Sequence, residues 1–368
     1  MTPGSPVASW WRTLHRFRVV LWCLGALGAL DLIVAVNADR WETYDLNPYR
    51  ERLNRCRQGA WDVLVAGGSP AMCGIDPTKL IGAHWNGRPI RSAYNLGLPL
   101  ATTSEVCLAV EHAVASPPQL LVYAVSATDL NDARFEPQGP RTLMTPADVV
   151  CWARLRPRDL EWCVRHFGGE CVSRLWQLYR HRNGIRLWAA DAADGILPGL
   201  CPDAATEARL KARVVGELRT GVGYRAEPAE TPHTRLDLRK AIGEPCDRLP
   251  FLEPYRLAGG HVKYLERLLD WAAERRVAVL LVDLPVPADL DERLYQREYA
   301  MYRALLRDVA GRRGVEVLTA RRDELGLTDA DFSDLIHLNA AGAARLSAWL
   351  RRAIDNPRTF AAATGESR

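Results

Sequence analysis

The sequence is poor in lysine, which supplies only four of its 48 basic residues, and no block of basic residues is interleaved with aromatic side chains. A nucleic-acid-binding surface needs such a block, and a net charge of +4 over 368 residues does not replace it. We therefore expect no nucleic-acid partner. The sequence also has no internal repeat and no low-complexity segment, and its 48% hydrophobic content excludes a disordered chain.

Paired metal-binding cysteines are absent as well. There is no CxxC pair and no His/Cys spacing of a zinc site, so we expect no metal bound by thiolates. The cysteines are either small buried apolar residues or partners in disulfides, and their odd number leaves any pairing open. They are Cys23, Cys56, Cys73, Cys107, Cys151, Cys163, Cys171, Cys201 and Cys246.

One long hydrophobic run lies near the N-terminus, over residues 19–36, and Arg12, Arg16 and Arg18 precede it. It is long enough for a transmembrane helix, and the basic flank directs the N-terminus toward the cytoplasm. We expect contact with the membrane through residues 19–36 and a single-pass protein of the inner, cytoplasmic membrane with its catalytic domain outside the cytoplasm. The expected segments are a cytoplasmic N-terminus over residues 1–18 and an anchor over residues 19–38.

Asp31 is the one charged residue in this run, and a carboxylate deep in hydrocarbon costs about 2.5 to 3.5 kcal/mol. Its place toward the outer end brings it near the lipid headgroups. Two alternatives stay open. Val36 and Ala38 fit a signal-peptidase site, so the run could be a signal peptide of an exported protein. It could also be a core helix of a soluble enzyme, although no polar face is present between Val19 and Leu30.

Short apolar runs alternate with helical patterns along much of the chain. Continuous apolar runs are typical of strands buried on both faces, and their alternation with helices predicts a parallel sheet with right-handed crossovers. We expect an α/β fold, a three-layer α/β/α sandwich with a flavodoxin-like sheet of about five strands. The strand candidates are residues 62–68, 91–99, 119–125, 277–285 and 314–320, and the helix candidates are residues 103–116, 259–276 and 298–313.

The alternation stops between Ala133 and about Pro254. We interpret this stretch as a mainly helical insertion, because it is far longer than an ordinary loop. Its tryptophans could line a cleft or lie at a membrane surface, although ordinary packing is the simpler interpretation. The expected parts are an α/β domain over residues 55–133 and 255–355, the insertion over 134–254 with helices at 147–166 and 169–192, and a flexible tail over 356–368.

The first informative motif is VLVAGGSPAMCGIDP, residues 63–77, in which a strand candidate leads through two glycines to Ser69 and Pro70. A serine before proline suits a helix N-cap, with the proline as the first helical residue. The alternative is a nucleophile, because a strand, a glycine turn and a helix start hold a hydroxyl at the carboxyl edge of a parallel sheet, where α/β proteins bind ligands.

The second motif is DFSDLIHLNAAGAARLSAWL, residues 331–350, in which Asp334 and His337 precede a helix with Asn339 as the expected N-cap. A carboxylate three residues before a histidine can accept one ring N–H and so fix the tautomer of a general base. Taken alone, the same pattern also fits a solvated loop.

Together these blocks resemble SGNH/GDSL-type hydrolases, in a membrane-anchored branch similar to bacterial cell-envelope acyl-esterases and O-acetyltransferases. GGSPAMCGIDP resembles the first block of the family, with Ser69 as nucleophile and Gly68 where many members have Asp. DLIHLN resembles the last block, with Asp334 as acid and His337 as base. The resemblance implies a Ser-His-Asp triad of Ser69, His337 and Asp334, and it implies no metal or organic cofactor.

The oxyanion hole implied by the resemblance is incomplete. NLGLP resembles the second block, where Gly97 would donate its backbone N–H together with that of Ser69. In the third block the family has a G-x-N-D pattern, but here SATDL follows the strand and Thr128 stands at the asparagine position, with Asn131 nearby as a substitute. Loss of one such donor typically costs about 100-fold to 1000-fold in turnover.

The expected function is a serine ester hydrolase or O-acyl(acetyl)transferase that acts on an acylated cell-envelope glycan or a related small ester. Two non-enzymatic alternatives stay open. One is a catalytically degenerate scaffold that binds a glycan, and the other is a membrane-anchored assembly factor whose insertion binds an envelope protein. The missing third-block asparagine favours these alternatives, whereas the presence of Ser69, Asp334 and His337 favours an enzyme.

Overall fold

The computed structural model describes residues 6–42, 48–133, 145–155, 160–197, 202–225, 252–257 and 259–356. The chain divides into two compact units. A helical unit comprises Met1–Asn47 and Arg165–Gly216, and an α/β unit comprises Pro48–Val164 and Glu217–Arg368. The helices of the expected insertion are therefore divided between the two units.

The α/β unit contains a five-stranded sheet in the order β4-β1-β5-β6-β7, and every neighbouring pair is parallel. In β1, Val63 pairs with Ala93 on one side and with Leu120 on the other. The chain thus places its second long strand on one side of β1 and its third on the other, which is the flavodoxin-like order. The strands are β1 (Val63–Gly67), β4 (Ala93–Gly97), β5 (Leu120–Val125), β6 (Ala278–Asp283) and β7 (Glu316–Thr319).

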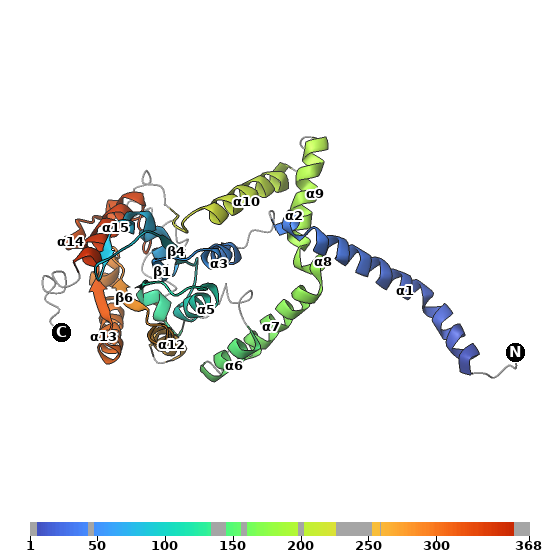
Figure 1. Ribbon diagram of the computed structural model, residues 1–368, viewed down its shortest axis with the longest axis horizontal. Coiled ribbons are helices and arrows are strands. Elements are labelled where there is room, and N and C mark those ends of the chain that lie inside the picture. The colour runs from blue at the N-terminus through green and yellow to red at the C-terminus, as the bar shows by residue number, and fades with distance from the viewer. Residues whose placement is uncertain are drawn as a thin grey trace. The chain divides into compact units, whose positions relative to one another are not determined.

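Side chains alternate between the two faces of the sheet. In β1, Leu64 and Ala66 contribute to one hydrophobic core, and Val63 and Val65 contribute to the other. Helices complete each core, which confirms the predicted α/β architecture in three layers (Figure 1). The first core includes α3 (Pro48–Gln58), α5 (Thr103–Ala113), α12 (Gly260–Glu274) and α13 (Gln296–Arg313), and the second includes α4 (Ser69–Gly74), η1 (Pro77–Leu80), α14 (Arg322–Leu325) and α15 (Ala340–Asp355).

Several short elements were not expected from the sequence. A two-stranded antiparallel hairpin turns at Asn86 and Gly87, both with positive φ, as a tight hairpin turn requires. The short elements are β2 (His84–Trp85), β3 (Arg88–Pro89), η2 (Ala127–Leu130), η6 (Asp289–Leu294) and η7 (Asp329–Asp331).

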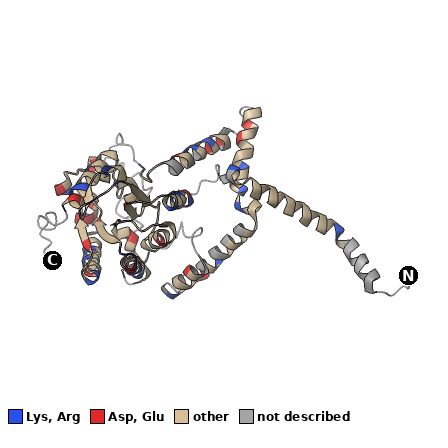
Figure 2. Ribbon diagram, in the orientation of Figure 1, with Lys and Arg blue, Asp and Glu red and all other residues tan. Residues whose placement is uncertain are grey.

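The helical unit contains the predicted N-terminal apolar helix, α1 (Pro6–Val36). Over Phe17–Val36 its mean hydropathy is 2.4 and only 6% of the segment is buried, so α1 is long and apolar enough to cross a membrane. Figure 2 shows few charged residues along the described part of this helix, Phe17–Val36. The short helix α2 (Ala38–Glu42) follows.

The helices expected at 147–166 and 169–192 have different boundaries. The backbone of Trp176 is extended, with φ −121° and ψ 94°, and it interrupts what the pattern predicts as one helix. At this break the Leu178 N–H donates to Asp31 Oδ1 at 2.6 Å, a tertiary contact that a local pattern does not contain. The helices are α6 (Pro146–Leu155), α7 (Leu160–Leu175), α8 (Gln177–Arg180), α9 (Arg182–Ile196) and α10 (Pro202–Thr220).

The structure describes only some of the cysteines and only the first residue of the expected tail. Six described cysteines are free thiols, namely Cys23, Cys56, Cys73, Cys107, Cys151 and Cys171. Apart from Asn356, the flexible tail expected over residues 356–368 lies outside the described residues.

Candidate active site

Ser69 lies at the carboxyl end of β1, at the position where the strand order reverses between β4 and β5. Open α/β sheets bind ligands at this switch point. Helix α4 begins at Ser69 itself, and Gly68 is the N-cap without a side-chain cap hydrogen bond. The interpretation of Ser69 as an N-cap is therefore wrong, because its side chain makes a different contact, described below.

The turn before Ser69 is tight because β5 and α4 approach Gly67 closely. A Cβ atom at Gly67 would lie 2.2 Å from the Ala124 carbonyl oxygen and 2.6 Å from the Ala71 Cβ atom. Real Cβ contacts are never this short, so only glycine fits here. The close approach directs the chain from the strand into α4 within two residues.

His337 and Asp334 lie in the loop before α15. Asp334 Oδ1 accepts the backbone N–H groups of Ile336 at 2.8 Å and His337 at 2.7 Å, which fixes the loop around the carboxylate. Asn339 caps α15 by accepting the N–H groups of Ala341 and Gly342, as the sequence predicts. Hydrogen bonds thus fix the loop at Asp334 and at the start of α15.

The three predicted residues form one hydrogen-bonded chain. His337 Nε2 lies 2.8 Å from Ser69 Oγ, and His337 Nδ1 lies 2.6 Å from Asp334 Oδ2. A carboxylate only accepts, so the bond to Asp334 places a proton on Nδ1 and leaves Nε2 of the neutral ring as an acceptor for the Ser69 O–H. This is the geometry of a nucleophile, a general base and an orienting acid.

The environment of Asp334 favours its ionised form. Partial burial acts to raise the pKa of Asp334, but the hydrogen bond from His337, the imidazole charge and two backbone N–H groups outweigh it and hold the pKa below its ordinary value of 3.8. The carboxylate is therefore charged at neutral pH and stabilises an imidazolium formed during proton transfer.

Solvent reaches this site. Ser69 is half-buried, and the His337 side chain is 20% exposed. A second serine–histidine pair in the α/β unit differs in this respect: Ser104 Oγ lies 3.2 Å from His261 Nδ1, but both residues are buried. Only the first of these two pairs can contact a substrate.

One predicted oxyanion donor fits the geometry. As the first residue of α4, Ser69 leaves its backbone N–H without an acceptor inside the helix. The next residue is Pro70, which has no N–H, and the N–H groups of Ala71 and Met72 both donate to the Gly68 carbonyl. The Ser69 N–H is therefore the available donor of this helix end.

Gly97, the second predicted donor, has another function. Its N–H donates to Asn95 Oδ1 at 2.7 Å, so in this arrangement it is engaged by a side chain instead of facing an oxyanion. A Cβ atom at Gly97 would lie 2.5 Å from the Met72 backbone, so this glycine permits α4 to pack closely on β4. The acceptor of the Gly97 N–H is the side chain two residues earlier in the same strand.

Asn95 is a structural residue that the sequence analysis missed. It is fully buried, and its Nδ2 donates to the Ala71 carbonyl at 2.9 Å and to the Ile75 carbonyl at 2.7 Å. It thus fastens the helix that carries Ser69 to the neighbouring strand. The signal in the sequence is a polar residue inside the apolar strand AYNLG, because a buried amide requires hydrogen-bond partners.

Thr128 and Asn131 are also engaged elsewhere. Thr128 Oγ1 lies 2.8 Å from Ser126 Oγ, and both side chains are buried. Asn131 Nδ2 donates to the Pro254 carbonyl at 2.9 Å, and Asn131 Oδ1 accepts the Arg256 N–H at 2.9 Å. Their hydrogen bonds hold the η2 turn and the segment around Pro254, so neither residue takes the expected oxyanion position in this arrangement.

Asp129 occupies the space beside Gly68. A Cβ atom at Gly68 would lie 2.9 Å from Asp129 Oδ1 and 3.2 Å from the Ala101 carbonyl oxygen, and Asp129 Oδ2 accepts the Ser126 N–H at 2.9 Å. The absence of a side chain at Gly68 therefore accommodates a carboxylate from the turn after β5. The sequence pattern contains both residues but not their contact.

The segment after α10 contacts both strand β4 and helix α4, the helix that begins at Ser69. The Asn95 N–H donates to the Val222 carbonyl at 2.9 Å, and the Arg225 N–H donates to the Met72 carbonyl at 3.2 Å. Arg52 is fully buried and donates to the Gly223 and Asn95 carbonyls, and desolvation lowers the pKa of Arg52. Residues 222–225 thus support the edge strand β4.

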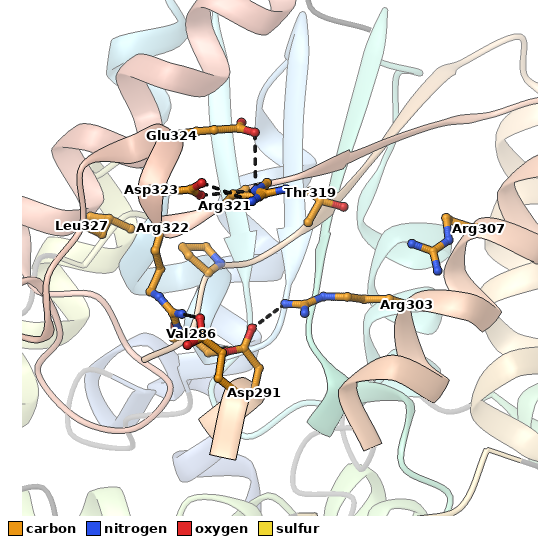
Figure 3. Close-up of a pocket in the computed structure, with 13 residues that line it drawn as sticks. Val286, Asp291, Arg303, Arg307, Thr319, Arg321, Arg322, Asp323, Glu324 and Leu327 are labelled. Carbon is orange, nitrogen blue, oxygen red and sulfur yellow. Dashed lines mark hydrogen bonds and ion pairs between the residues drawn. The ribbon is translucent and has the colours of Figure 1, made fainter. Parts of the chain in front are cut away.

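A cavity of about 700 Å³ lies at the carboxyl ends of β6 and β7 (Figure 3). Ser69, Asp334 and His337 do not line it. Arg303 pairs with Asp291 at 2.8 Å, and Arg322 pairs with the same carboxylate at 3.1 Å. Since the neighbouring acids neutralise these arginines, the cavity offers no strong charge of one sign.

The described ranges contain no group of three or more His, Cys, Asp or Glu side chains arranged to hold a metal ion. The residues of the candidate site are instead those of acyl transfer, a hydroxyl, an imidazole and a carboxylate.

No family model matches the chain, and no curated protein matches it either. Among solved structures, the crystal structure of the lipase/acylhydrolase from Enterococcus faecalis is similar over 81% of this chain and 97% of that chain, with 10% sequence identity and a TM-score of 0.38. A similarity of this size says nothing about activity.

Proposed function

We propose that the chain is a serine ester hydrolase or O-acyltransferase in which Ser69 is the nucleophile. The observation that carries this proposal is the chain of hydrogen bonds from Ser69 Oγ to His337 Nε2 and from His337 Nδ1 to Asp334 Oδ2, at 2.8 and 2.6 Å. It lies at a solvent-accessible position on the carboxyl edge of a parallel sheet, where a substrate carbonyl can approach.

The reaction follows from these contacts. Ser69 Oγ attacks the ester carbonyl carbon while its proton moves to His337 Nε2, and Asp334 stabilises the resulting imidazolium. The alkoxide leaving group then takes the proton from Nε2, and the acyl group remains on Ser69. Water or a sugar hydroxyl then attacks the acyl carbon while His337 Nε2 takes its proton, and the proton passes to Ser69 Oγ as the acyl–serine bond breaks, which gives hydrolysis or transfer.

The oxyanion of each tetrahedral intermediate accepts a hydrogen bond from the Ser69 N–H at the N-terminus of α4. The positive end of this short helix adds to the stabilisation. Since the N–H of Gly97 and the side chains of Thr128 and Asn131 are engaged, we expect a slower enzyme than one with three donors.

The proposed location is outside the cytoplasm, with α1 as a single membrane anchor and its N-terminus in the cytoplasm. The apolar segment Phe17–Val36 and the arginines before it support this orientation. An acylated cell-envelope glycan is the substrate class that fits an acyl-transfer site in this compartment, and cleavage after Ala38 would release an exported form.

Labelling with a fluorophosphonate probe tests the nucleophile directly. We expect detergent-solubilised full-length protein to be labelled at Ser69 and a folded Ser69→Ala variant not to be labelled. Ser104→Ala is the matched control, because it removes the buried serine of the other serine–histidine pair and should leave the labelling at Ser69 unchanged. Labelling that survives Ser69→Ala would contradict the proposal.

A second candidate function is a scaffold that binds an acylated glycan without turnover. The engagement of Gly97, Thr128 and Asn131 in structural hydrogen bonds favours it. Folded wild-type protein that is neither labelled nor active on any acyl ester, but binds an acetylated glycan, would replace the enzyme proposal with this one.

A further inference from the structure

Asp31 has a partner inside the helical unit. It lies within the apolar segment Phe17–Val36, and its Oδ1 accepts the Leu178 N–H at 2.6 Å, at the break between α7 and α8. The bond satisfies one of the N–H groups that the start of α8 leaves without a helical acceptor. The carboxylate that interrupts the apolar segment is therefore a cap for a second helix.

The contact covers one face of the last part of α1. Asp31, Val34 and Ala35 are at least half-buried, and they follow the spacing of one helix face. Leu32 and Ile33, between them in the sequence, are 65% and 56% exposed. The helices α8 and α2 both contact α1, and the other sides of α1 keep an exposed apolar surface.

The position of Asp31 along α1 gives the depth of this contact. A rise of 1.5 Å per residue makes the 20-residue segment about 30 Å long, which is the thickness of a hydrocarbon core. Asp31 is five residues before Val36, or about 7 to 8 Å inside the outer end of the segment. Leu178 is hydrogen-bonded to Asp31 and has to lie at a similar depth.

Side chains around the break suit this depth. Leu175 is 83% exposed, and the exposed Trp176 and Tyr179 stack with ring centroids 6.0 Å apart. The Arg182 guanidinium lies 4.1 Å from the Tyr179 ring centroid. Trp and Tyr concentrate at membrane–water interfaces, and arginine extends its charged group toward lipid phosphates while its stem stays in apolar surroundings.

We propose that the α7–α8 junction, with Leu175, Trp176 and Tyr179, lies in the outer leaflet of the membrane that α1 crosses, close to the boundary between its hydrocarbon and its headgroups. The occupant of this exposed apolar surface is the lipid of the outer leaflet. Asp31 is the positioning residue, since it holds the junction at this level of α1. The inference rests on the proposed membrane span of α1 and adds a second, non-spanning lipid contact.

Photo-crosslinking of the full-length chain in phosphatidylethanolamine/phosphatidylglycerol vesicles tests the proposal. A benzophenone amino acid is placed at Leu175, at Leu30 as the control within the span, or at Glu274, which is 74% exposed on α12, and lipid adducts are counted by intact-mass spectrometry. We expect adducts at positions 175 and 30 and a yield at least several-fold lower at 274.

The outcomes separate the two proposals. An adduct at position 30 without one at 175 would overturn the inference and leave the membrane span in place. The absence of an adduct at position 30 would overturn the span itself. Equal yields at positions 175 and 274 would show unspecific labelling and would also overturn the inference.

The role of Asp31 has its own test in the same vesicles. Asp31→Ala removes the acceptor for the Leu178 N–H, and we expect it to lower the adduct yield at position 175 several-fold while the yield at position 30 stays unchanged. Asp31→Asn keeps an oxygen acceptor and should restore the yield. An unchanged yield in Asp31→Ala would overturn the positioning role.

Discussion

His337 Nε2 lies 2.8 Å from Ser69 Oγ, although 268 positions separate the two residues in the chain. The contact joins the turn after the first strand of the sheet to the loop before the last helix. Both segments lie at the carboxyl edge of the parallel sheet, so the fold brings a hydroxyl and an imidazole together without a local motif that contains both.

The triad makes a prediction about non-additivity. Ser69→Ala and His337→Ala should each lower the turnover of a short-chain aryl ester by roughly 1000-fold or more, and the double variant should be little worse, because residues that act as a unit lose activity together. Asp334→Asn should retain more activity. Initial rates measured per folded molecule check this, and additive losses in the double variant would contradict a shared mechanism.

Gly97 should tolerate no side chain. In Gly97→Ala the new Cβ atom would lie 2.5 Å from the Met72 backbone and would displace α4, so we expect a loss of about 1–3 kcal/mol in the free energy of unfolding and lower turnover. The matched control is Gly311→Ala in α13, where the new Cβ atom would have no atom within 4 Å apart from its chain neighbours and the backbone of its own helix.

Gly311→Ala should increase the free energy of unfolding by about 0.5–1 kcal/mol, since alanine favours a helix more than glycine does. Urea unfolding of both variants checks the pair of predictions. A Gly97→Ala variant as stable as the wild type would show that α4 does not depend on this close approach.

Gly68 and Asp129 should be energetically coupled. Gly68→Asp places a second carboxylate beside Asp129, whose Oδ1 would lie 2.9 Å from the new Cβ atom, so both crowding and like-charge repulsion should lower stability. Gly68→Ala introduces the crowding without the charge and should be less harmful. In a double-mutant cycle with Asp129→Asn, the charge-dependent part of the loss should decrease. Strictly additive effects would argue against the contact.

The ion pair between α5 and α6 predicts a pH dependence of stability. His112 Nε2 lies 2.9 Å from Asp148 Oδ2, and this hydrogen bond raises the pKa of His112 above its ordinary value of 6.5. Burial acts to raise the pKa of Asp148, but its hydrogen bonds to His112 and Thr145 outweigh burial and lower the pKa below 3.8.

The contribution of His112 to stability is present below about pH 6.5 and is lost as the pH rises through its folded-state pKa. The contribution of Asp148 is present above about pH 3.8 and is lost as the pH falls through its folded-state pKa. The difference in Tm between wild type and His112→Asn should therefore be largest near pH 5 and smaller at pH 8. A constant difference across this range would exclude the ion pair as its cause.

The local patterns of the sequence predicted much of the α/β unit. Continuous apolar runs mark β1, β5 and β6, because a strand buried on both faces is predominantly apolar. Asn339 marks the start of α15, since capping depends on residues within three positions of each other. The contact between Asp334 and His337 is of the same local kind.

Two features depended on side-chain placement and packing that the patterns do not contain. The Gly97 N–H is used by Asn95, and α7 ends before Trp176, where Leu178 meets Asp31. The acceptor of the Gly97 N–H is a side chain two residues away in the same strand, whereas the acceptor of the Leu178 N–H is 147 positions away in the chain. The sequence determined which segments form strands and helices, and packing determined which donors remain available for chemistry, because hydrogen-bond partners are selected by distance in space.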